Sequence, residues 1–242
     1  MAQGPDRKYM TRSEAEVAGV DVGLRSYMLR VYNYMALGVG LTGALALFVV
    51  SQPALMQAIG GMFWIFFIGV LGLGFFAPRI MMSKSVLAAQ ACFWVYATLW
   101  GLLIAPIFAQ FIQAGAGMDI VRAFFITAGT FAAVSIYGYT TKRDLSPFAT
   151  FFFMAAIGIL IAILVNVFFV QSTLFSLITS VIVVLLFSGI TAYETQVIKS
   201  MYREGDLDDT AQRKAIFGAF MLYGSFITLF IHILNILGIM RD

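Results

Sequence analysis

Seven long apolar segments constrain this chain more than any other feature. Each has about 20 residues or more, which is enough for a helix to cross roughly 30 Å of hydrocarbon. None shows the alternation typical of a membrane β-strand, and lipid offers no hydrogen-bond partners to open backbone groups. The sequence therefore predicts an all-α polytopic membrane protein with seven transmembrane helices. The segments cover about 28–50, 55–77, 85–108, 118–140, 148–170, 174–197 and 215–240.

Composition excludes a soluble globular domain. Hydrophobic residues make up 61% of the chain and charged residues 11%, whereas soluble domains carry about 25% charged residues. The net charge of +3 indicates membrane topology rather than nucleic-acid binding, so we expect the lipid bilayer as the main partner and no nucleic acid. The single cysteine, Cys92, cannot form an internal disulfide or a cysteine metal cluster.

The distribution of Lys and Arg predicts an orientation. With a cytoplasmic N-terminus, 13 of the 15 cationic residues lie inside: in the tail with the start of the first span, and in the 78–84, 141–147 and 198–214 loops. Only Arg122 and Arg241 fall outside. Since inside loops carry the cationic excess, the sequence predicts seven spans with the N-terminus in and the C-terminus out. An even number would require a re-entrant segment, and the seventh, the most polar, is the first candidate.

Two regions follow from the polarity of the chain. Residues 1–25 are polar and charged, and we expect a cytoplasmic tail there, followed by the transmembrane domain over 26–242. The tail lacks the apolar core of about 7–15 residues that a signal peptide shows, so we do not expect one. We place the protein in a membrane, with the tail at the cytoplasmic surface.

Small residues recur within the spans and bear on helix packing. Gly38, Gly40 and Gly43 lie in the first span, Gly189 in the sixth and Gly218 in the seventh. Small side chains let membrane helices approach closely, so we favour a compact bundle in which these glycines contact neighbouring helices. A glycine-lined pore is the alternative.

Glu194 is the carboxylate that lies well inside apolar sequence. An ionisable residue within a span is costly and is by default a functional candidate. Apolar surroundings disfavour the charged form of a carboxyl group, so such a group can exchange a proton near neutral pH. Thr191, three residues earlier, offers a hydroxyl on the same helix face. The alternative is a surface Glu that extends toward the cytoplasm near Lys199, about 7–8 Å along the helix. Spacing alone leaves both interpretations open.

The sequence lacks a catalytic constellation. The only histidine, His232, has no carboxylate at helical spacing, and no HExxH motif or glycine-rich phosphate loop occurs. Asp119 has no second aspartate within an apolar run, as an intramembrane aspartyl protease would need. We therefore expect no enzyme activity, no cofactor and no certain metal site. We expect Asp119 and Arg122 to pair at i, i+3, and Asn166 to bond between helices.

Several stretches resemble one family. They are YGYTTKRDLS at 137–146, TAYETQ at 191–196, the entry helix SYMLRVYNYMALGVGLTG at 26–43 and AIFGAFMLYGSFITLFIHILNILG at 215–238. Together they resemble the Bax inhibitor-1 family, and the first helix is most similar to bacterial members. The resemblance implies a bundle with the last helix central, an inner-membrane location and a pH-sensitive calcium leak. It also implies association of some bacterial members with a membrane protease complex; a homo-oligomer is considered as well.

The resemblance also implies a site, in which this chain departs from the family pattern. The resemblance implies a pair of aspartates, one in the family motif TAYDTQ and one in the family motif LYLDFINLF of the last helix. Glu194 stands at the first position here, and Ser225 stands at the second. Two carboxylates that share a proton make a pH switch, whereas one carboxylate and one hydroxyl predict a shallower response and weaker calcium binding. Glu194 and Ser225 form the predicted proton and cation site. The predicted supporting residues are Thr191, Thr228, His232 and Asn235.

Two functions therefore remain. The first is a pH-modulated leak or transporter for a cation such as Ca²⁺, with Glu194 as its proton and cation site. The alternative is a non-transporting membrane protein that binds and modulates a membrane protease complex, with the polar N-terminal tail as the contact.

Overall fold

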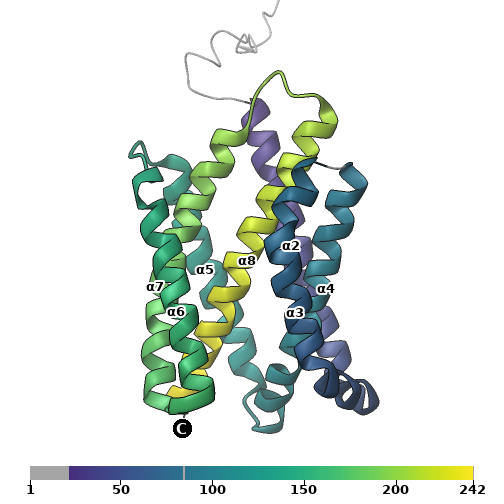
Figure 1. Cartoon of the computed structure of the whole chain (residues 1–242), viewed down its shortest axis with the longest axis vertical. Helices are drawn as coiled ribbons and strands as arrows, with labels where there is room; N and C mark the ends of the chain where they lie inside the picture. Colours follow the sequence, from purple (N-terminus) through teal and green to yellow (C-terminus); the bar gives the residue numbers. More distant parts are fainter. Residues whose placement is uncertain (1–21, 84, 242) are drawn as a thin grey trace, which may run out of the picture.

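The structure is a computed structural model that describes residues 22–83 and 85–241. Seven of its helical segments are long and apolar enough to cross a membrane, and the described residues contain no strand. The prediction of a seven-span, all-α membrane protein is confirmed (Figure 1). The helices are α2 (Val22–Val50), α3 (Pro53–Ser83), α4 (Val86–Gln113), α5 (Gly117–Thr140), α6 (Ala149–Val165), α7 (Thr173–Met201) and α8 (Asp208–Arg241). Short turns, η1 (Ser146–Phe148) and η2 (Asn166–Val170), extend α6 at its two ends.

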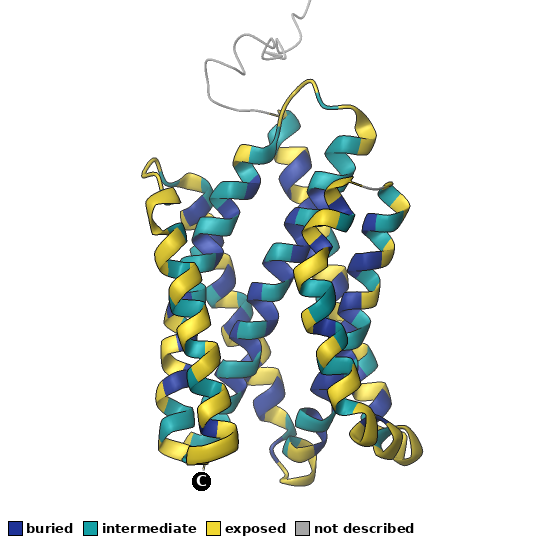
Figure 2. Ribbon diagram, viewed as in Figure 1, coloured by how far each residue is buried: buried dark blue, intermediate teal, exposed yellow. Residues whose placement is uncertain are grey.

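The last helix, α8, is the centre of the bundle. It packs against α2, α3, α4, α5 and α7, and in its most apolar stretch 67% of the residues are buried, against 6% in the α6 span. Figure 2 shows the buried residues concentrated along α8 and on the faces that surround it. The expectation of a central last helix, which came from the family resemblance, is confirmed.

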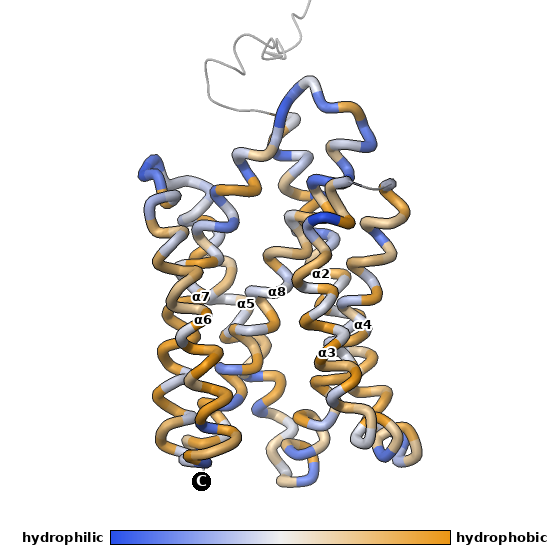
Figure 3. Tube along the Cα trace, viewed as in Figure 1, coloured by the Kyte–Doolittle hydropathy of each residue, from blue (hydrophilic) through white to orange (hydrophobic). Residues whose placement is uncertain are grey.

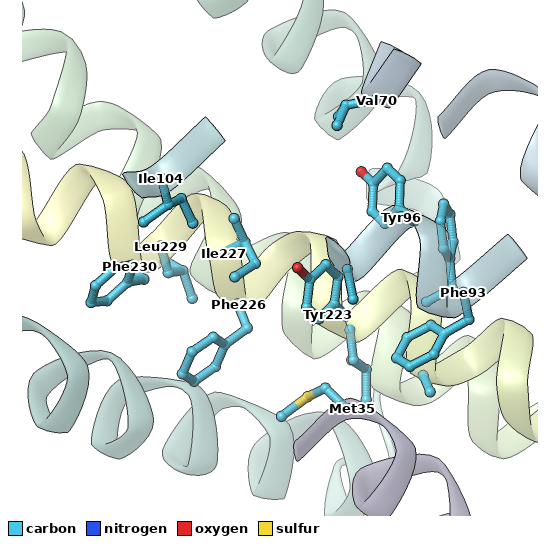
Figure 4. Close-up of a cluster of buried hydrophobic side chains, with 14 of the residues drawn as sticks. Met35, Val70, Phe93, Tyr96, Ile104, Tyr223, Phe226, Ile227, Leu229 and Phe230 are labelled. Atoms are coloured by element: carbon cyan, nitrogen blue, oxygen red, sulfur yellow. The ribbon is translucent and has the colours of Figure 1, made fainter. Parts of the chain in front are cut away.

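An aromatic and aliphatic core surrounds the middle of α8 (Figure 4). Tyr223 is fully buried, and its ring meets the ring of Phe93 from α4 edge to face at 5.8 Å. The Tyr223 hydroxyl and Thr42 Oγ1 are 2.6 Å apart, and Thr42 Oγ1 also donates to the carbonyl oxygen of Ala97 at 2.9 Å. These hydrogen bonds join α2, α4 and α8 within the apolar core.

The charged residues lie mainly at the two ends of the bundle, where the connections between helices are. The start of α2 and the links α3–α4, α5–α6 and α7–α8 lie at one end, and the C-terminus lies at the other (Figure 1). Polar residues gather at these ends, and apolar residues lie between them (Figure 3). At the C-terminal end, Arg122 pairs with Asp119 at 2.8 Å, as expected, and Arg241 donates to the carbonyl oxygen of Ala114. Which end faces the cytoplasm stays a prediction from the positive-inside rule.

Several helix boundaries differ from those predicted. α3 continues past Pro78 to Ser83, and α4 passes Pro106 and ends at Gln113. A proline removes one backbone hydrogen bond, but neighbouring helices and local adjustments make this tolerable within membrane helices. α2 begins at Val22, so the last residues of the expected tail are helical; residues 1–21 lie outside the described part. α8 is one uninterrupted helix of 34 residues, so the re-entrant alternative for the seventh span is wrong.

Asn166 has a local role at the turn between α6 and α7. Its Oδ1 accepts from the backbone N–H of Ser172, and its Nδ2 donates to the Ser172 carbonyl oxygen. Ser172 in turn caps α7, since its Oγ accepts from the N–H of Phe175. Asn166 therefore fixes the connection between two consecutive helices.

The glycines divide into two groups. A Cβ added at Gly38 would lie 2.7 Å from Cζ of Phe93, and one at Gly218 would lie 2.9 Å from Cγ2 of Ile198. These two residues allow close helix packing, as predicted. Gly40 and Gly43 differ, because a Cβ added at either would meet no atom within 4 Å. The packing prediction is wrong for them, and they face open space instead.

Candidate functional site

Glu194 and Ser225 meet across the interface between α7 and α8. Ser225 Oγ donates to Glu194 Oε2 at 2.6 Å, and the Ser225 side chain is buried with 2% of its surface exposed. Short O–H···O distances of this kind are typical of a hydrogen bond to a carboxylate. Ser225 lies in the middle of the central helix, between the buried residues Tyr223 and Phe226. The structure thus brings together the two residues that form the predicted site.

Lys199, the predicted partner of a surface Glu194, has other contacts. Its Nζ donates to the carbonyl oxygen of Tyr139 at 2.9 Å and lies 4.8 Å from the centre of the Tyr139 ring. Lys199 therefore ties α7 to α5. Over residues 22–83 and 85–241, no Lys or Arg side chain lies within ion-pair distance of Glu194. The partly buried Glu194 side chain is directed at α8.

Two of the predicted supporting residues, both threonines, donate their hydroxyl hydrogen bonds to backbone carbonyl oxygens of their own helices. Thr191 Oγ1 donates to the Phe187 carbonyl oxygen at 2.7 Å, and Thr228 Oγ1 donates to the Gly224 carbonyl oxygen at 2.9 Å. Such bonds to the residue four positions earlier are common for Thr in helices. The Ser225 hydroxyl is therefore the side-chain donor found on Glu194.

The other two supporting residues belong to a second polar cluster. His232 Nδ1 and Ser180 Oγ are 3.0 Å apart, and Asn235 Nδ2 donates to Ser180 Oγ at 2.8 Å and to Ser176 Oγ at 2.9 Å. His232 follows Ser225 by seven residues, or about 10 Å along the helix axis. The cluster joins α7 to α8 nearer the C-terminal end, and no hydrogen bond links it directly to Glu194.

Sequence reasoning missed Ser176 and Ser180. Two serines in an apolar helix give little signal, since membrane serines commonly bond to their own backbone. Their i, i+4 spacing was the available clue, because it places both hydroxyls on one helix face. A serine pair on α7 facing the His232 and Asn235 positions of α8 would have predicted the cluster.

The geometry limits which ions Glu194 can hold. Its carboxylate and the Ser225 hydroxyl supply three oxygen atoms, whereas Ca²⁺ prefers about six to eight. Within the described residues, no group of three or more His, Cys, Asp or Glu side chains is placed to hold a metal ion. The arrangement suits a proton or a weakly held, mostly hydrated cation.

Comparisons with known proteins identify one family. A family model described as "Inhibitor of apoptosis-promoting Bax1" matches residues 24–242. The inner membrane protein YbhL of Escherichia coli K12 is 38% identical over 222 residues, which cover 89% of this chain and 92% of YbhL. An uncharacterised protein of Rickettsia prowazekii is 40% identical over 92% of this chain and 93% of its own length.

The family match extends over nearly the whole membrane domain. The family match begins at residue 24, two residues after the start of α2, and includes both Glu194 and Ser225. The seven spans and the similarity to an inner membrane protein place the chain in the bacterial inner membrane as an integral protein. This chain belongs to the Bax inhibitor-1 family.

Proposed function

We propose that this protein is a cation leak whose activity depends on pH through the side chain of Glu194. The observation that carries the proposal is the hydrogen bond from Ser225 to Glu194 between the central helix and α7. An ionisable residue held within membrane helices marks an ion or proton pathway more often than a structural contact. The family resemblance supports the same function.

The two protonation states of Glu194 would contact α8 differently. The ionised carboxylate accepts the hydrogen bond from the Ser225 hydroxyl and attracts a cation. The neutral acid has its own O–H to donate and no longer attracts a cation. Protonation therefore changes both the cation affinity and the hydrogen bonding between α7 and α8. No catalytic step is part of this proposal.

Calcium, if it is the transported ion, would be held weakly. One carboxylate and one hydroxyl leave most of the calcium ligands to water. A single titrating carboxyl also exchanges a single proton, so the pH response would be shallower than that of two coupled carboxyls. The proposal therefore combines a weak cation site with a one-proton pH dependence.

Flux measurements test the proposal. Purified protein in proteoliposomes would be assayed for Ca²⁺ and K⁺ flux across about pH 5–8, where buried carboxyl groups can titrate. We expect the wild-type flux to change with pH and the flux of Glu194→Gln to be independent of it. Asp119→Asn is the matched control, because it removes a carboxylate at the C-terminal end and should keep the wild-type profile. Superimposable wild-type and Glu194→Gln curves would remove Glu194 from the mechanism.

The alternative, a protein that binds and modulates a membrane protease complex, rests on the family resemblance alone. Its proposed contact is the N-terminal tail, and residues 1–21 of that tail lie outside the described part of the chain. Deletion of residues 2–20 tests it by co-purification: loss of a protease partner would support a role for the tail, and unchanged co-purification would exclude the tail as the contact.

A further inference from the structure

A lateral gap separates α2 from α5. Both helices pack on α8, α2 also packs on α4, and α5 also packs on α7, but α2 and α5 hardly touch each other. Two cavities lie within this gap, one above the other along the helix axes. We call the two cavities together the α2–α5 groove. It is separate from the contact between Glu194 and Ser225 on α7 and α8.

The first cavity lies at the basic end of the bundle and has a volume of about 640 Å³. Its α2 wall runs from Arg25 to Ala36, which is about 16 Å along the helix axis. That length is about half of the 30 Å hydrocarbon thickness, or one leaflet. The cavity therefore matches one leaflet in depth. Its lining includes Arg25, Tyr32 and Ala36 of α2, and Phe131, Ala132 and Ser135 of α5.

The polar groups of this cavity are few and sit among apolar side chains. Arg25 is its only charged lining residue, and its side chain is exposed at the outer end of the cavity. Ser135 is 3% exposed, and its hydroxyl faces the Tyr32 hydroxyl of α2 across the cavity. Each hydroxyl can donate and accept hydrogen bonds, so the pair can bind a polar group of a ligand. These features favour a ligand with an anionic end and polar groups close behind it.

The second cavity continues the groove beyond the middle of the bundle. Its volume is about 250 Å³, and its lining is almost wholly apolar. Gly40 and Gly43 line it, and both face open space, while Phe124, Phe226 and Phe230 form much of the opposite wall. Side chains at these two glycine positions would narrow the groove. The second cavity can therefore receive the end of an apolar chain.

The lining and setting of the groove favour a lipid as the occupant. The groove runs between two membrane-spanning helices, its lining is mostly apolar, and its one charged lining residue lies at its outer end. The surrounding bilayer supplies acyl chains that carry an anionic headgroup, and Arg25 complements that charge.

We propose that the α2–α5 groove binds one anionic phospholipid. Its phosphate pairs with Arg25, its polar backbone lies near Ser135 and Tyr32, and one acyl chain runs past Ala36 and Ala132 toward Gly40. The ligand enters sideways from the leaflet at the basic end of the bundle. This inference does not depend on ion conduction, because no contact of Glu194 enters it.

Native mass spectrometry of the full chain with competing lipids tests the proposal. Detergent-purified protein would be mixed with equal amounts of phosphatidylglycerol and phosphatidylcholine that carry identical acyl chains. We expect retained phosphatidylglycerol to exceed phosphatidylcholine. Arg25→Gln should lower that preference about fivefold, the effect of one cation near an anionic lipid surface, and Ala132→Phe should block binding by filling the groove.

Two matched variants control for general effects. Arg30→Gln removes a cation from α2 without touching the groove, and Ala133→Phe adds the same bulk at an exposed position beside the groove lining. Both should retain phosphatidylglycerol as wild type does. Equal losses in Arg25→Gln and Arg30→Gln, or in Ala132→Phe and Ala133→Phe, would overturn the proposal.

A second measurement needs no variant and so does not depend on folding of the mutants. Phosphatidylglycerol with a photoreactive group in one acyl chain would be crosslinked to the wild-type protein in bilayer nanodiscs, and the labelled peptides would be sequenced. The proposal expects labels concentrated between residues 29 and 43 of α2 and 124 and 136 of α5. Labels spread evenly over the exposed faces of α3 and α6 would contradict it.

Discussion

The replacement of a second carboxylate by Ser225 is the residue-scale feature that defines this site. The Ser225 hydroxyl donates a hydrogen bond to Glu194 Oε2 at 2.6 Å and adds no second negative charge to the site. Ser225→Asp would place another carboxylate against Glu194, and two close carboxyls share one proton and titrate as a pair. We expect a steeper pH dependence of flux and tighter Ca²⁺ binding than in wild type, measured in proteoliposomes. Ser225→Asn is the uncharged control, and identical profiles for the two variants would contradict the account.

Asp144 gives a pH prediction outside the membrane. The Ser146 backbone N–H donates to Asp144 Oδ1 at 2.9 Å, and this bond, with a smaller contribution from the Ser146 hydroxyl, holds the pKa of the exposed Asp144 carboxyl below its ordinary value. Because the folded-state pKa is the lower one, the stabilisation is present above the unfolded-state pKa and is lost as pH falls through the folded-state pKa.

Asp144→Asn should therefore loosen the turn at residues 144–146 at neutral pH, and the difference from wild type should shrink in acid. Hydrogen exchange of this turn in detergent at several pH values measures the effect. A difference between wild type and variant that grows as the pH is lowered would be the wrong sign.

At the scale of elements, Gln196 links α7 to the connection between α5 and α6. Its Nε2 donates to the Arg143 carbonyl oxygen at 2.7 Å, and its Oε1 accepts from the Leu145 backbone N–H at 2.8 Å. Gln196→Ala removes both hydrogen bonds, which together contribute about 1–3 kcal/mol. We expect faster hydrogen exchange over residues 143–148 with the pH profile of flux retained. Unchanged exchange would show that other contacts hold this connection.

The sequence predicted elements better than it predicted their contacts. Hydropathy located α5 within a residue at each end, since a glycine-containing break precedes it and a charged break follows it. It ended the α3 span at Pro78, because a sequence does not show whether neighbouring helices make a proline tolerable. The pairing of Glu194 with Ser225 followed from the family motifs and not from spacing. The sequence predicted helix packing at Gly40 and Gly43. That prediction was wrong because a sequence does not show whether a neighbouring helix approaches a small residue.

At the scale of the whole molecule, the basic end of the bundle predicts its orientation. Single cysteines in a Cys92→Ala background would report it, because Cys92 is buried and small. Asp144→Cys lies in the connection between α5 and α6, at the basic end, and Gln171→Cys lies in the connection between α6 and α7, at the opposite end (Figure 1). If the basic end is cytoplasmic, a membrane-impermeant maleimide should label position 171 from the periplasm and position 144 only after the membrane is opened. The reverse pattern would invert the topology.

The central claim is that the Glu194 carboxyl takes up and releases a proton inside the bundle, next to Ser225. Infrared difference spectroscopy of the reconstituted protein between about pH 5 and 8, where buried carboxyls can titrate, measures this most directly. The account predicts a protonated-carboxyl band that rises in acid, is absent in Glu194→Gln and shifts in Ser225→Ala as its hydrogen bond is lost. A band that is the same in wild type and Glu194→Gln would contradict it.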